Sequence, residues 1–482
     1  MYSRLHRHLD RRRGAHWNPA AGGEPLTPDR SGPNLFPLPP SGGRARGEGP
    51  RADQAAPASR TRSFHIWTIG CQMNAADSEG LARRLLAAGY VEDSLERADV
   101  AILNTCVVRQ ASEDRVYSKL HELKSWKTPE RTVAVTGCIV AKEGGELGRR
   151  FPQLDPVMVP IGEYENFVAA LEARYDYSQG EALPAAGRTG VSHYVRVIQG
   201  CDHNCTFCIV PKVRGRERHL PMAAVVEECR HAVDAGAKEV VLLGQNVDDY
   251  RDPGGEGGLA ALVRNVERIP GLKRLRFLTS HPQDLETELL EVMAASDVVC
   301  RELQLPVQSG DDGVLKRMAR GYQMRHYRAI VERARGLMPD LGLATDVIVG
   351  FPGESEAAFL NTRRLLQEIE FDVVHLAMYS PRPGTFAADR MQDDVANPEK
   401  LRRLNDLLAL QRDIASRKTA RWVGRDVEVL IEGRDELGRP YGRIRQGKRA
   451  VVLRGSGLEP GQLVNVRVLQ ATAGQLAGLP AA

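Results

Sequence analysis

The chain has 482 residues and a mass of 53.1 kDa, a length that predicts two to four domains. With 42% hydrophobic and 27% charged residues and no apolar run near the ~18 residues that cross a bilayer, we expect a globular protein without membrane spans. The net charge of +4 is unevenly distributed, with +6 on residues 1–62, −6 on residues 63–418 and +4 on residues 419–482. A polyanionic partner would therefore bind the C-terminal segment.

The first 62 residues contain eleven Arg, nine Pro and eight Gly, with few aliphatic residues. Such a segment cannot bury enough apolar area to offset the entropy of ordering, so we expect it to be disordered and without a catalytic role. No apolar stretch follows its arginines, which argues against a signal peptide. Eight cysteines are too few for a disulfide scaffold of this length, so the sequence predicts a protein of the reducing cytoplasm.

Residues 63–175 are predicted to form a parallel-sheet α/β domain, because buried strands alternate with helical patterns. A helix through Leu81, Leu85 and Leu86 follows the first strand. Ligand sites of such sheets lie beyond the carboxyl ends of the strands. A cysteine follows each of three expected strands, so we expect these cysteines to converge on one site. The strands are residues 64–69, 100–103 and 133–135, and the cysteines are Cys71, Cys106 and Cys138.

A linker, residues 176–190, precedes a second α/β series at residues 191–418. Six βα units predict a partial (β/α)6 barrel, whose chemistry lies at the carboxyl ends of the strands. A long helix, roughly residues 398–421, leads out of it. The expected strands are residues 194–198, 240–243, 274–278, 302–305, 343–349 and 373–378.

The last segment, residues 419–482, changes to short alternating runs separated by Gly-rich turns. This pattern predicts a small antiparallel β-barrel of the OB-like type, which commonly binds oligonucleotides. The expected strands are residues 427–431, 441–444, 450–453 and 463–469.

Within that barrel, residues 442–448 match most of the sequence pattern of a phosphate-binding loop. Arg449 replaces the hydroxyl residue and no helix follows, so we exclude nucleoside triphosphate binding. The alternatives left open are a contact with a phosphate backbone and a merely solvated face. The residues suited to the phosphate contact are Arg439, Tyr441, Arg443, Arg445 and Arg454.

Directly after the first barrel strand, Cys201, Cys205 and Cys208 form a CxxxCxxC pattern with Phe207 before the last cysteine. Three thiolates from one loop can hold three irons of a [4Fe–4S] cluster and leave the fourth iron open. S-adenosylmethionine (SAM) can bind that iron through its amino and carboxylate groups, and electron transfer then breaks its C–S bond. A structural zinc site with His203 as fourth ligand is the alternative, although its ligands would be crowded into one turn.

The triplet, its partial barrel and several further segments resemble the tRNA-2-methylthio-N(6)-dimethylallyladenosine synthase family of radical-SAM methylthiotransferases. The resemblance covers residues 63 to 418, and the C-terminal barrel resembles the TRAM domain of that family. The matching segments are 70–74, 77–79, 104–106, 108–109, 137–138, 243–247, 279–282, 305–310, 350–354 and 379–385.

This resemblance implies two [4Fe–4S] clusters and SAM as cofactors. An auxiliary cluster on Cys71, Cys106 and Cys138 would keep one iron free to hold the inserted sulfur. One SAM would supply a methyl group, and another would generate the radical that takes hydrogen from carbon 2 of an adenine. The substrate would be N(6)-isopentenyladenosine next to the anticodon of tRNA, in a loop where a base can leave the stack.

Four residues at expected strand ends are candidates for SAM contacts: Gly244, Gln308, Ser309 and Asp346. Turn formation and hydrogen bonding within the barrel are equally good explanations of all four. His281 is either a pocket residue or an ordinary loop histidine. Cys229 and Cys300 lie in apolar contexts and are expected to be buried and not to bind metal.

Related branches use the same clusters on threonylcarbamoyladenosine in tRNA or on an aspartate of a ribosomal protein. They lack Gln245-Asn246 and the 279–282 and 382–385 segments in this form. This chain departs from the family at His219-Leu220 and Lys212-Val213, so its substrate preference could differ. A non-enzymatic iron–sulfur or zinc RNA-binding protein is the other alternative. We expect a monomer with tRNA, an electron donor and a sulfur source as partners.

Overall fold

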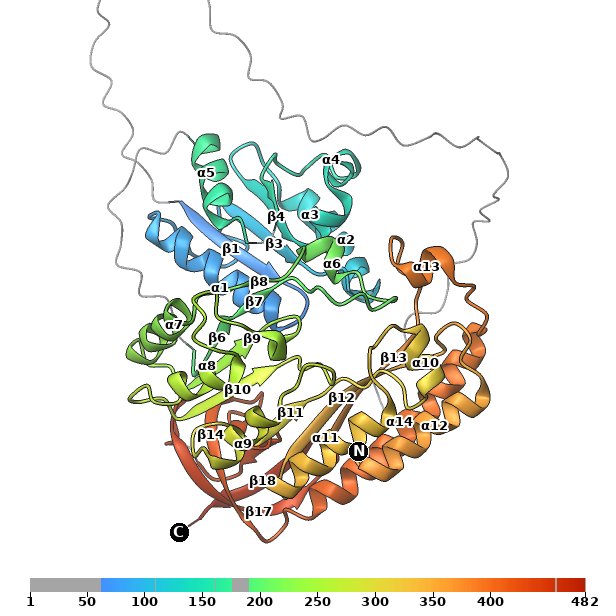
Figure 1. Ribbon diagram of the computed structural model, residues 1–482. Coiled ribbons are helices and arrows are strands. Elements are labelled where there is room, and N and C mark those ends of the chain that lie inside the picture. Colours follow the sequence, from blue (N-terminus) through green and yellow to red (C-terminus); the bar gives the residue numbers. More distant parts are fainter. Residues whose placement is uncertain (1–61, 109, 161, 176–189, 456, 482) are drawn as a thin grey trace, which may run out of the picture. The chain divides into compact units, whose positions relative to one another are not determined.

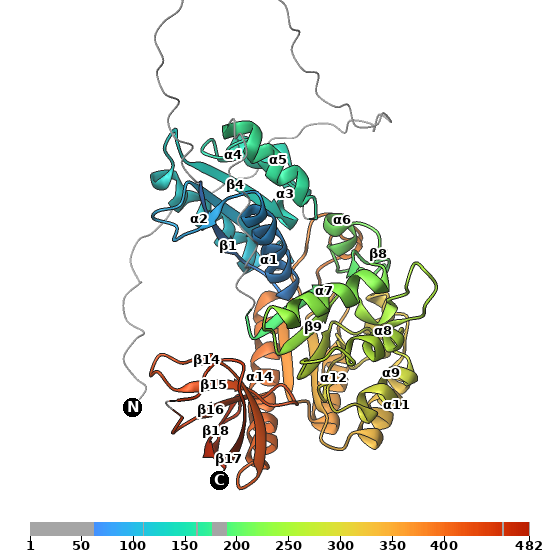
Figure 2. The ribbon, with the colours of Figure 1, turned by 90° about the vertical axis from the view of Figure 1, so that its left-hand side faces the viewer.

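The computed structural model describes residues 62–108, 110–160, 162–175, 190–455 and 457–481. The expected N-terminal extension, apart from Arg62, and the expected linker, apart from Gly190, lie outside these residues. No helix in the described ranges is long and apolar enough to cross a membrane. The described residues all belong to one compact unit (Figures 1 and 2).

The first described domain is a five-stranded, all-parallel sheet with the strand order β2-β1-β3-β4-β5, which confirms the predicted α/β fold. Along β3, alternate residues enter two different apolar cores, one shared with α1 and α5 and the other with α2 and α3. The elements are β1 (Ser63–Thr68), α1 (Gln72–Ala87), β2 (Val91–Glu92), β3 (Val100–Thr105), α2 (Gln110–Trp126), β4 (Thr132–Gly137), α3 (Cys138–Glu143), α4 (Gly145–Arg150), β5 (Met158–Val159) and α5 (Tyr164–Tyr175).

The second domain contains the six predicted barrel strands, but they form two three-stranded parallel sheets instead of one continuous sheet. The orders are β10-β9-β6 and β11-β12-β13, and a bridge between Leu275 and Val299 joins the two halves. The strands are β6 (Ser192–Arg196), β9 (Glu239–Leu243), β10 (Arg274–Leu278), β11 (Glu302–Gln304), β12 (Gly342–Val349) and β13 (Val373–Met378).

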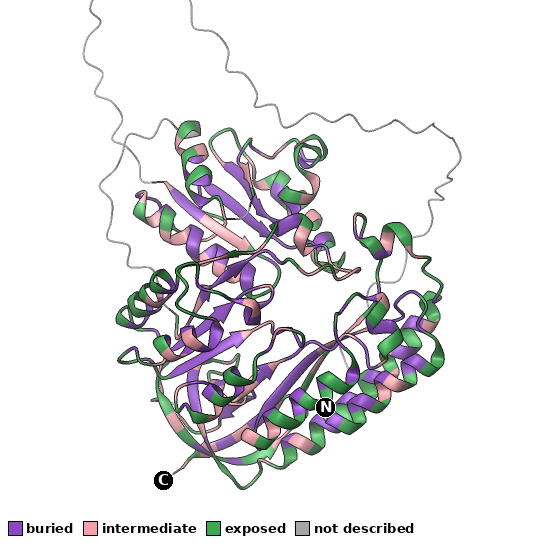
Figure 3. Cartoon of the chain, in the orientation of Figure 1, coloured by how far each residue is buried: buried purple, intermediate pink, exposed green. Residues whose placement is uncertain are grey.

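Helices cover these barrel strands, and the layer between them is the largest apolar core of the described chain, drawn in purple in Figure 3. A two-stranded antiparallel ribbon, β7 (Ile198–Gln199) and β8 (Arg218–His219), brackets the CxxxCxxC loop. The helices are α6 (Val210–Arg214), α7 (Met222–Asp234), the 3-10 turn η1 (Val247–Asp249), α8 (Leu259–Val266), α9 (Thr287–Ala295), α10 (Asp312–Arg317), α11 (Met324–Leu337), α12 (Glu356–Ile369), α13 (Phe386–Arg390) and α14 (Asn397–Ala420).

The C-terminal segment forms the predicted closed barrel, with the strand order β14-β15-β16-β18-β17. One pair, β16 with β18, is parallel, so the barrel is not purely antiparallel. The fifth strand, β18, was absent from the prediction because its sequence alternates weakly; Gly478 is required there, since a Cβ would lie 2.1 Å from the Arg467 carbonyl oxygen. The strands are β14 (Asp426–Arg434), β15 (Pro440–Arg443), β16 (Arg449–Val452), β17 (Leu463–Ala471) and β18 (Gln475–Pro480).

This C-terminal barrel packs against the amino ends of the strands of the second domain. Arg274, at the start of β10, is fully buried and donates to the backbone oxygens of Arg443 and Glu428, the latter at 3.0 Å. Arg276 donates to the carboxylate of Glu239 at 2.7 Å, and Arg443 also binds Glu239 at 2.6 Å. Charged groups from both domains thus satisfy one another in a buried joint, far from the carboxyl ends of the strands.

Candidate active site

Cys71, Cys106 and Cys138 all follow strands of the first sheet at its carboxyl edge. Cys71 is the residue before α1, Cys106 follows β3, and Cys138 is the first residue of α3, directly after β4. The structure brings the three thiols together: the pKa of Cys106 rises to about 11 through burial, and the nearby Cys138 and Cys71 thiols contribute to that rise. Three cysteines that are far apart in the sequence therefore meet because their strands end at the same edge of the sheet.

Two glycines allow the three thiols to approach one another. A Cβ on Gly70, whose φ is +139°, would lie 2.7 Å from the Cβ of Cys106. A Cβ on Gly137, whose φ is +97°, would lie 2.4 Å from the backbone oxygen of Thr105. Both positions require glycine for conformation and for space, because other residues rarely adopt positive φ and have no room here.

The other three cysteines lie on one loop after β7. The amide of Cys208 donates to the carbonyl oxygen of Cys205 at 3.0 Å, which closes a tight turn. Burial raises the pKa of Cys201 to about 12 and that of Cys208 to about 11. The buried Arg320 donates to Cys205 Sγ at 3.4 Å and to the carbonyl oxygen of Pro306 at 2.9 Å, so a guanidinium faces this trio. Cys205 and Cys208 also line a cavity of about 350 Å³.

The spacing of the sulfurs argues against a single zinc ion in either trio. Four sulfurs around zinc at ~2.3 Å would lie about 3.8 Å apart. Among the described residues, the group of three metal-binding side chains whose ligand atoms all lie within 4.8 Å is His203, His281 and Asp284, and neither cysteine trio meets that limit. All eight cysteines are free of disulfides. Free thiols that do not all lie within 4.8 Å of one another fit a cubane cluster, whose ligands sit on different irons.

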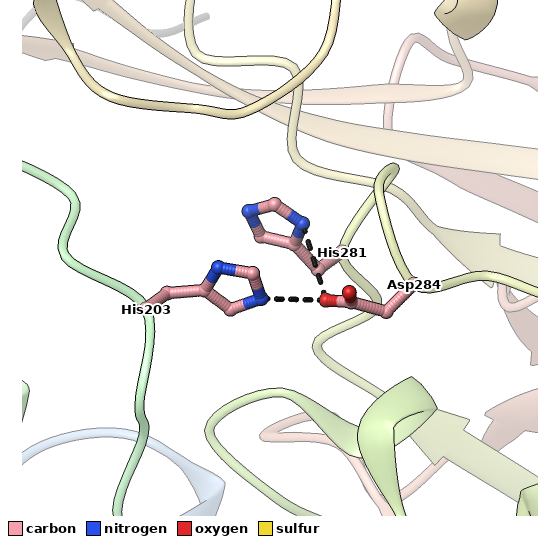
Figure 4. Close-up of side chains that lie close together, drawn as sticks. All are labelled: His203, His281 and Asp284. Carbon is pink, nitrogen blue, oxygen red and sulfur yellow. Dashed lines mark hydrogen bonds and ion pairs between the residues drawn. The ribbon is translucent and has the colours of Figure 1, made fainter.

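His203 does not join the thiols as the zinc alternative requires. Its Nε2 atom lies 2.6 Å from Asp284 Oδ2, and its ring stacks on His281 with centroids 4.1 Å apart (Figure 4). The hydrogen bond to Asp284 raises the pKa of His203, whereas burial, Arg320 and His203 lower that of His281 to about 2. Asn246 donates to the same oxygen of Asp284 at 2.8 Å. The group forms a hydrogen-bonded polar cluster beside the cysteine loop, and His281 Nε2 within it is buried without a partner among the described residues.

The four SAM candidates differ in their surroundings. Gly244 is closely packed, because a Cβ would lie 3.2 Å from Val247 Cα. The hydroxyl of Ser309 contacts Thr362 Oγ1 at 3.3 Å and accepts from the amide of Asp311, so it is engaged within the fold.

The other two candidates, Gln308 and Asp346, are joined to each other through their backbones. Gln308 has a φ of +70° and pairs its backbone with β12, where its amide donates to the carbonyl oxygen of Asp346 at 2.8 Å. The carboxylate of Asp346, which is half-buried, accepts from Gln304 Nε2 at 3.3 Å. A second non-glycine residue at a strand end, Thr279, has a φ of +73°. Positive φ at a β-branched residue is uncommon and tends to occur at functional sites.

Sequence reasoning missed the two arginines that face the thiols. Arg320 follows α10, and Arg214 ends α6. Neither has a sequence signal of its own, because arginines are common and only the tertiary fold buries these two. The side chain of Gln245 was also missed; its Oε1 accepts from the amide of Gly200 at 2.7 Å and thereby supports the start of the cysteine loop.

On the C-terminal barrel, two of the residues suggested for a phosphate contact are engaged elsewhere. Arg443 binds Glu239 and Glu432, and Arg445 donates to the backbone oxygens of Asp297 and Val299. Both hold the joint with the second domain, so that interpretation is wrong for them.

Arg439, Arg449 and Arg454 are partly or fully exposed on this barrel, and Arg439 is paired with Asp435 at 2.7 Å. Arg439 and the exposed Arg454 line a hollow of about 660 Å³. The guanidinium of Arg449 lies 4.3 Å from the centre of the Tyr441 ring. These residues, and not Arg443 or Arg445, form the candidate nucleic-acid surface.

Comparison with known families matches each domain separately. Residues 63–159 match the uncharacterized protein family UPF0004, residues 195–366 match the radical SAM superfamily and residues 420–479 match the TRAM domain. A tRNA-2-methylthio-N(6)-dimethylallyladenosine synthase of Dehalococcoides mccartyi is 41% identical over 413 residues, which cover 85% of this chain and 96% of that protein. The chain belongs to this synthase family. Synthases of Roseiflexus sp. and Chlorobium luteolum are 42% and 39% identical, and the matches cover 83% and 86% of this chain and 86% and 97% of those proteins.

A solved structure supports the fold of this synthase family member. The radical S-adenosylmethionine methyltransferase TsrM from Kitasatospora setae superimposes with a TM-score of 0.50 at 13% identity. The match covers 68% of this chain and 77% of that one. At this identity the likeness concerns the fold alone.

Proposed function

We propose that this chain is a radical-SAM enzyme that adds a methylthio group to carbon 2 of N(6)-isopentenyladenosine next to the anticodon of tRNA. The observation that carries the proposal is the presence of two separate trios of free, clustered thiols, each beyond the carboxyl ends of its own parallel sheet. One trio would serve to cleave SAM and the other to hold sulfur, and both are needed for a reaction that transfers sulfur and methyl together.

The six cysteines are assigned to two [4Fe–4S] clusters. Cys201, Cys205 and Cys208 would hold the cluster that binds SAM, and Cys71, Cys106 and Cys138 would hold the auxiliary cluster. The donor sets fit: each has three thiols, spaced too widely for one zinc ion. When bound, the clusters and SAM supply the electron, the radical, the methyl group and the site of sulfur insertion.

The protein side chains would bind and orient SAM beside the cysteine loop. Phe207 meets Phe351 edge to face at 6.4 Å between ring centroids, and Phe351 meets Tyr379 at 5.1 Å, so aromatic rings gather near the carboxyl ends of β12 and β13. Phe351 and Tyr379 are buried and Phe207 is half-buried, so Phe207 is the ring proposed to meet the adenine of SAM, with the other two behind it. Asp346 and the backbone of Gln308 are the polar groups proposed to orient SAM. The proposed roles of Gly244 and Ser309 are limited to shaping the loops that carry these contacts.

tRNA is the substrate, and we propose that the C-terminal barrel helps to hold it. Three of its basic residues, Arg439, Arg449 and Arg454, are proposed for phosphate contacts, which fix position without reading sequence. We propose domain boundaries at residues 63–175, 191–418 and 419–482. We further propose that the enzyme acts as a monomer in the cytoplasm, where its tRNA substrate is available, with a separate electron donor and a separate sulfur source.

The test is an anaerobic incubation of the reconstituted protein with SAM, a reductant and prenylated tRNA, followed by mass analysis of the nucleosides. We expect 2-methylthio-N(6)-isopentenyladenosine with prenylated tRNA and no product with the same tRNA lacking the prenyl group. Active SAM cleavage without this product would remove the tRNA assignment and favour threonylcarbamoyladenosine or a ribosomal protein as substrate. A protein that holds iron but produces no 5′-deoxyadenosine would instead be a non-enzymatic RNA-binding protein.

A further inference from the structure

Arg214 belongs to the second domain but lies in the thiol site of the first. It ends α6, which begins two residues after Cys208. This short helix packs against α3, whose first residue is Cys138, and Val213 is part of the apolar core of the first domain. The side chain of Arg214 is 4% exposed. A segment that starts at one cysteine trio therefore places a guanidinium at the other.

Only one of the two terminal nitrogens of the Arg214 guanidinium has a hydrogen-bond partner at the contact between the two domains. Its Nη2 atom donates to Asp77 Oδ2 at 3.1 Å. Its Nη1 atom is buried and has no hydrogen-bond partner within the ranges that the structure describes. An unpartnered buried donor destabilises the fold, so its presence points to an acceptor that belongs there.

The missing acceptor lies on the side of the thiols. Val213, the residue before Arg214, packs in the same apolar core as Cys138, and α6 packs against α3, which begins at Cys138. Anionic sulfur at this site would accept from Nη1, whereas neutral thiols are poor acceptors.

Asp77 is shared by two guanidinium groups, of which only that of Arg214 is buried. Asp77 accepts from Arg196 at 3.2 Å, from Arg214 at 3.1 Å and from the neutral hydroxyl of Tyr164 at 2.8 Å. Two guanidinium groups thus face one carboxylate. A doubly positive cubane core held by three thiolates would carry one negative charge, which is complementary to the guanidinium of Arg214, and charge and hydrogen bonds at the sulfurs set the potential of such a cluster.

We propose that Arg214 is a positioning residue of the auxiliary cluster: its Nη1 donates to a cluster sulfur, and its charge stabilises the reduced, more negative state. The inference rests on the assignment of the auxiliary cluster under the proposed function. Because Arg214 follows the SAM-cleaving loop by six residues, the same side chain also fixes that loop to the sulfur site. Removing it should lower the reduction potential of the auxiliary cluster and leave that of the other cluster unchanged.

The test is a potentiometric titration, followed by EPR, of the full chain in which Cys201, Cys205 and Cys208 are all replaced by Ala, so that the auxiliary cluster alone is observed. With Arg214→Met, we expect at least a tenfold lower reduced-to-oxidised ratio at a fixed potential, equivalent to about 59 mV for one electron. Arg214→Lys keeps the charge and should restore most of the ratio.

Arg196→Met is the matched control. It removes the other guanidinium partner of Asp77, and no contact of Arg196 with the cysteines is recorded among the described residues. We expect a wild-type potential for this variant. In a chain with Cys71, Cys106 and Cys138 replaced by Ala, Arg214→Met should leave the potential of the remaining cluster unchanged.

Three results would overturn the inference. They are an unshifted potential in Arg214→Met, an equal shift in Arg196→Met, or, where Arg214→Met fails to bind iron, an Arg214→Lys variant that binds about four irons with an unchanged EPR signal and potential. Failure of the proposed function has a different signature, because the wild-type chain would then bind about four irons in total instead of about eight.

Discussion

The two cysteine trios reach similar chemistry by different structural routes. The trio at residues 201–208 lies on one loop, so its local sequence is sufficient to bring the thiols together. The trio of the first domain comes from three strand ends that span residues 71–138, and only the parallel sheet unites them. The ligands of a cluster can therefore come from one local sequence motif or from several strand ends that only the fold brings together. The second kind depends on the register of a whole sheet.

The two trios also differ in which domain supplies the arginine side chain that faces them. Arg320, which faces Cys205, belongs to the same domain as its trio. Arg214 comes from the neighbouring domain and is paired with Asp77 of α1. The first site is self-contained, whereas the second is completed across a domain joint. Damage to that joint should therefore impair sulfur insertion more than SAM cleavage.

The largest expected effect comes from single substitutions that remove one cysteine from either trio, because each trio should support a different chemical step. Cys205→Ala should reduce 5′-deoxyadenosine formation to the background of the assay, because the SAM-binding cluster loses a ligand. Cys71→Ala should keep SAM cleavage and abolish the methylthio product. Each variant should fall from about eight irons to about four, measured by iron analysis and EPR. Cys229→Ala removes a buried cysteine outside both trios and should keep both clusters; loss of SAM cleavage in Cys71→Ala would contradict separate roles.

The next effect concerns the joint that completes the auxiliary site. Asp77→Ala leaves the buried guanidinium of Arg214 and the partly exposed one of Arg196 without their shared carboxylate, which should cost about 3–5 kcal/mol of unfolding free energy. Urea denaturation of the cluster-loaded protein, followed by circular dichroism, measures the change. Glu146→Ala removes an equally charged but exposed side chain of the same domain and should change stability by about 0.5 kcal/mol or less. Equal effects of the two substitutions would show that the joint is not structural.

A smaller effect concerns the second domain, where the buried carboxyl of Asp248 should make the free energy of unfolding depend on pH. Burial raises the pKa of Asp248 from 3.8 to about 8, although its carboxylate accepts from the amide of His281 and the hydroxyl of Ser280. A raised pKa means that the folded state holds this proton more tightly than the unfolded state. The resulting stability is complete below pH 3.8 and is lost as the pH rises through about 8.

Asp248→Asn should therefore flatten the pH dependence. Between pH 6 and pH 9 we expect the wild-type unfolding free energy to fall by on the order of 1–3 kcal/mol more than that of the variant, measured by urea denaturation. Parallel curves for the two proteins would show that Asp248 is ionised throughout.

The smallest effect concerns the nucleic-acid surface, which is shared by both chemical steps. Arg454→Ala should raise the KM for tRNA about two- to fivefold and reduce the salt dependence of binding by about one charge, without changing SAM cleavage. Arg268→Ala removes an exposed arginine from the second domain and should leave both quantities unchanged. An equal loss in both variants would indicate general charge attraction instead of a contact at the C-terminal barrel.

The sequence predicted elements well where a local rule determines the structure. The helix through Leu81 and Leu85 was predicted from apolar spacing, and the strands of both α/β domains were predicted from buried runs. The convergence of the first trio was also predictable, since it follows from strand ends in a parallel sheet. The family and the fold class predicted from the motifs are confirmed by the comparisons.

The misses have a common physical cause, because they depend on which distant groups meet. Arg443 resembles a phosphate ligand until Glu239, far away in the chain, is found beside it. Ser309 looks available until the packing of α12 brings Thr362 to its hydroxyl. Arg214 and Arg320 are ordinary in the sequence and unusual only because the fold buries them. Such pairings are properties of tertiary structure and have no local pattern.

The position of the joint at Arg274 and Arg276 has a consequence for the size of the RNA that the enzyme can use. The C-terminal barrel is fastened to the amino ends of the strands, whereas the cysteine loop follows a carboxyl end. The intervening strand β12 has eight residues, a length of about 26 Å. An RNA that contacts both the C-terminal barrel and the cysteine loop must span about this distance. An isolated anticodon loop can therefore contact only one of the two places, whereas an intact tRNA can contact both.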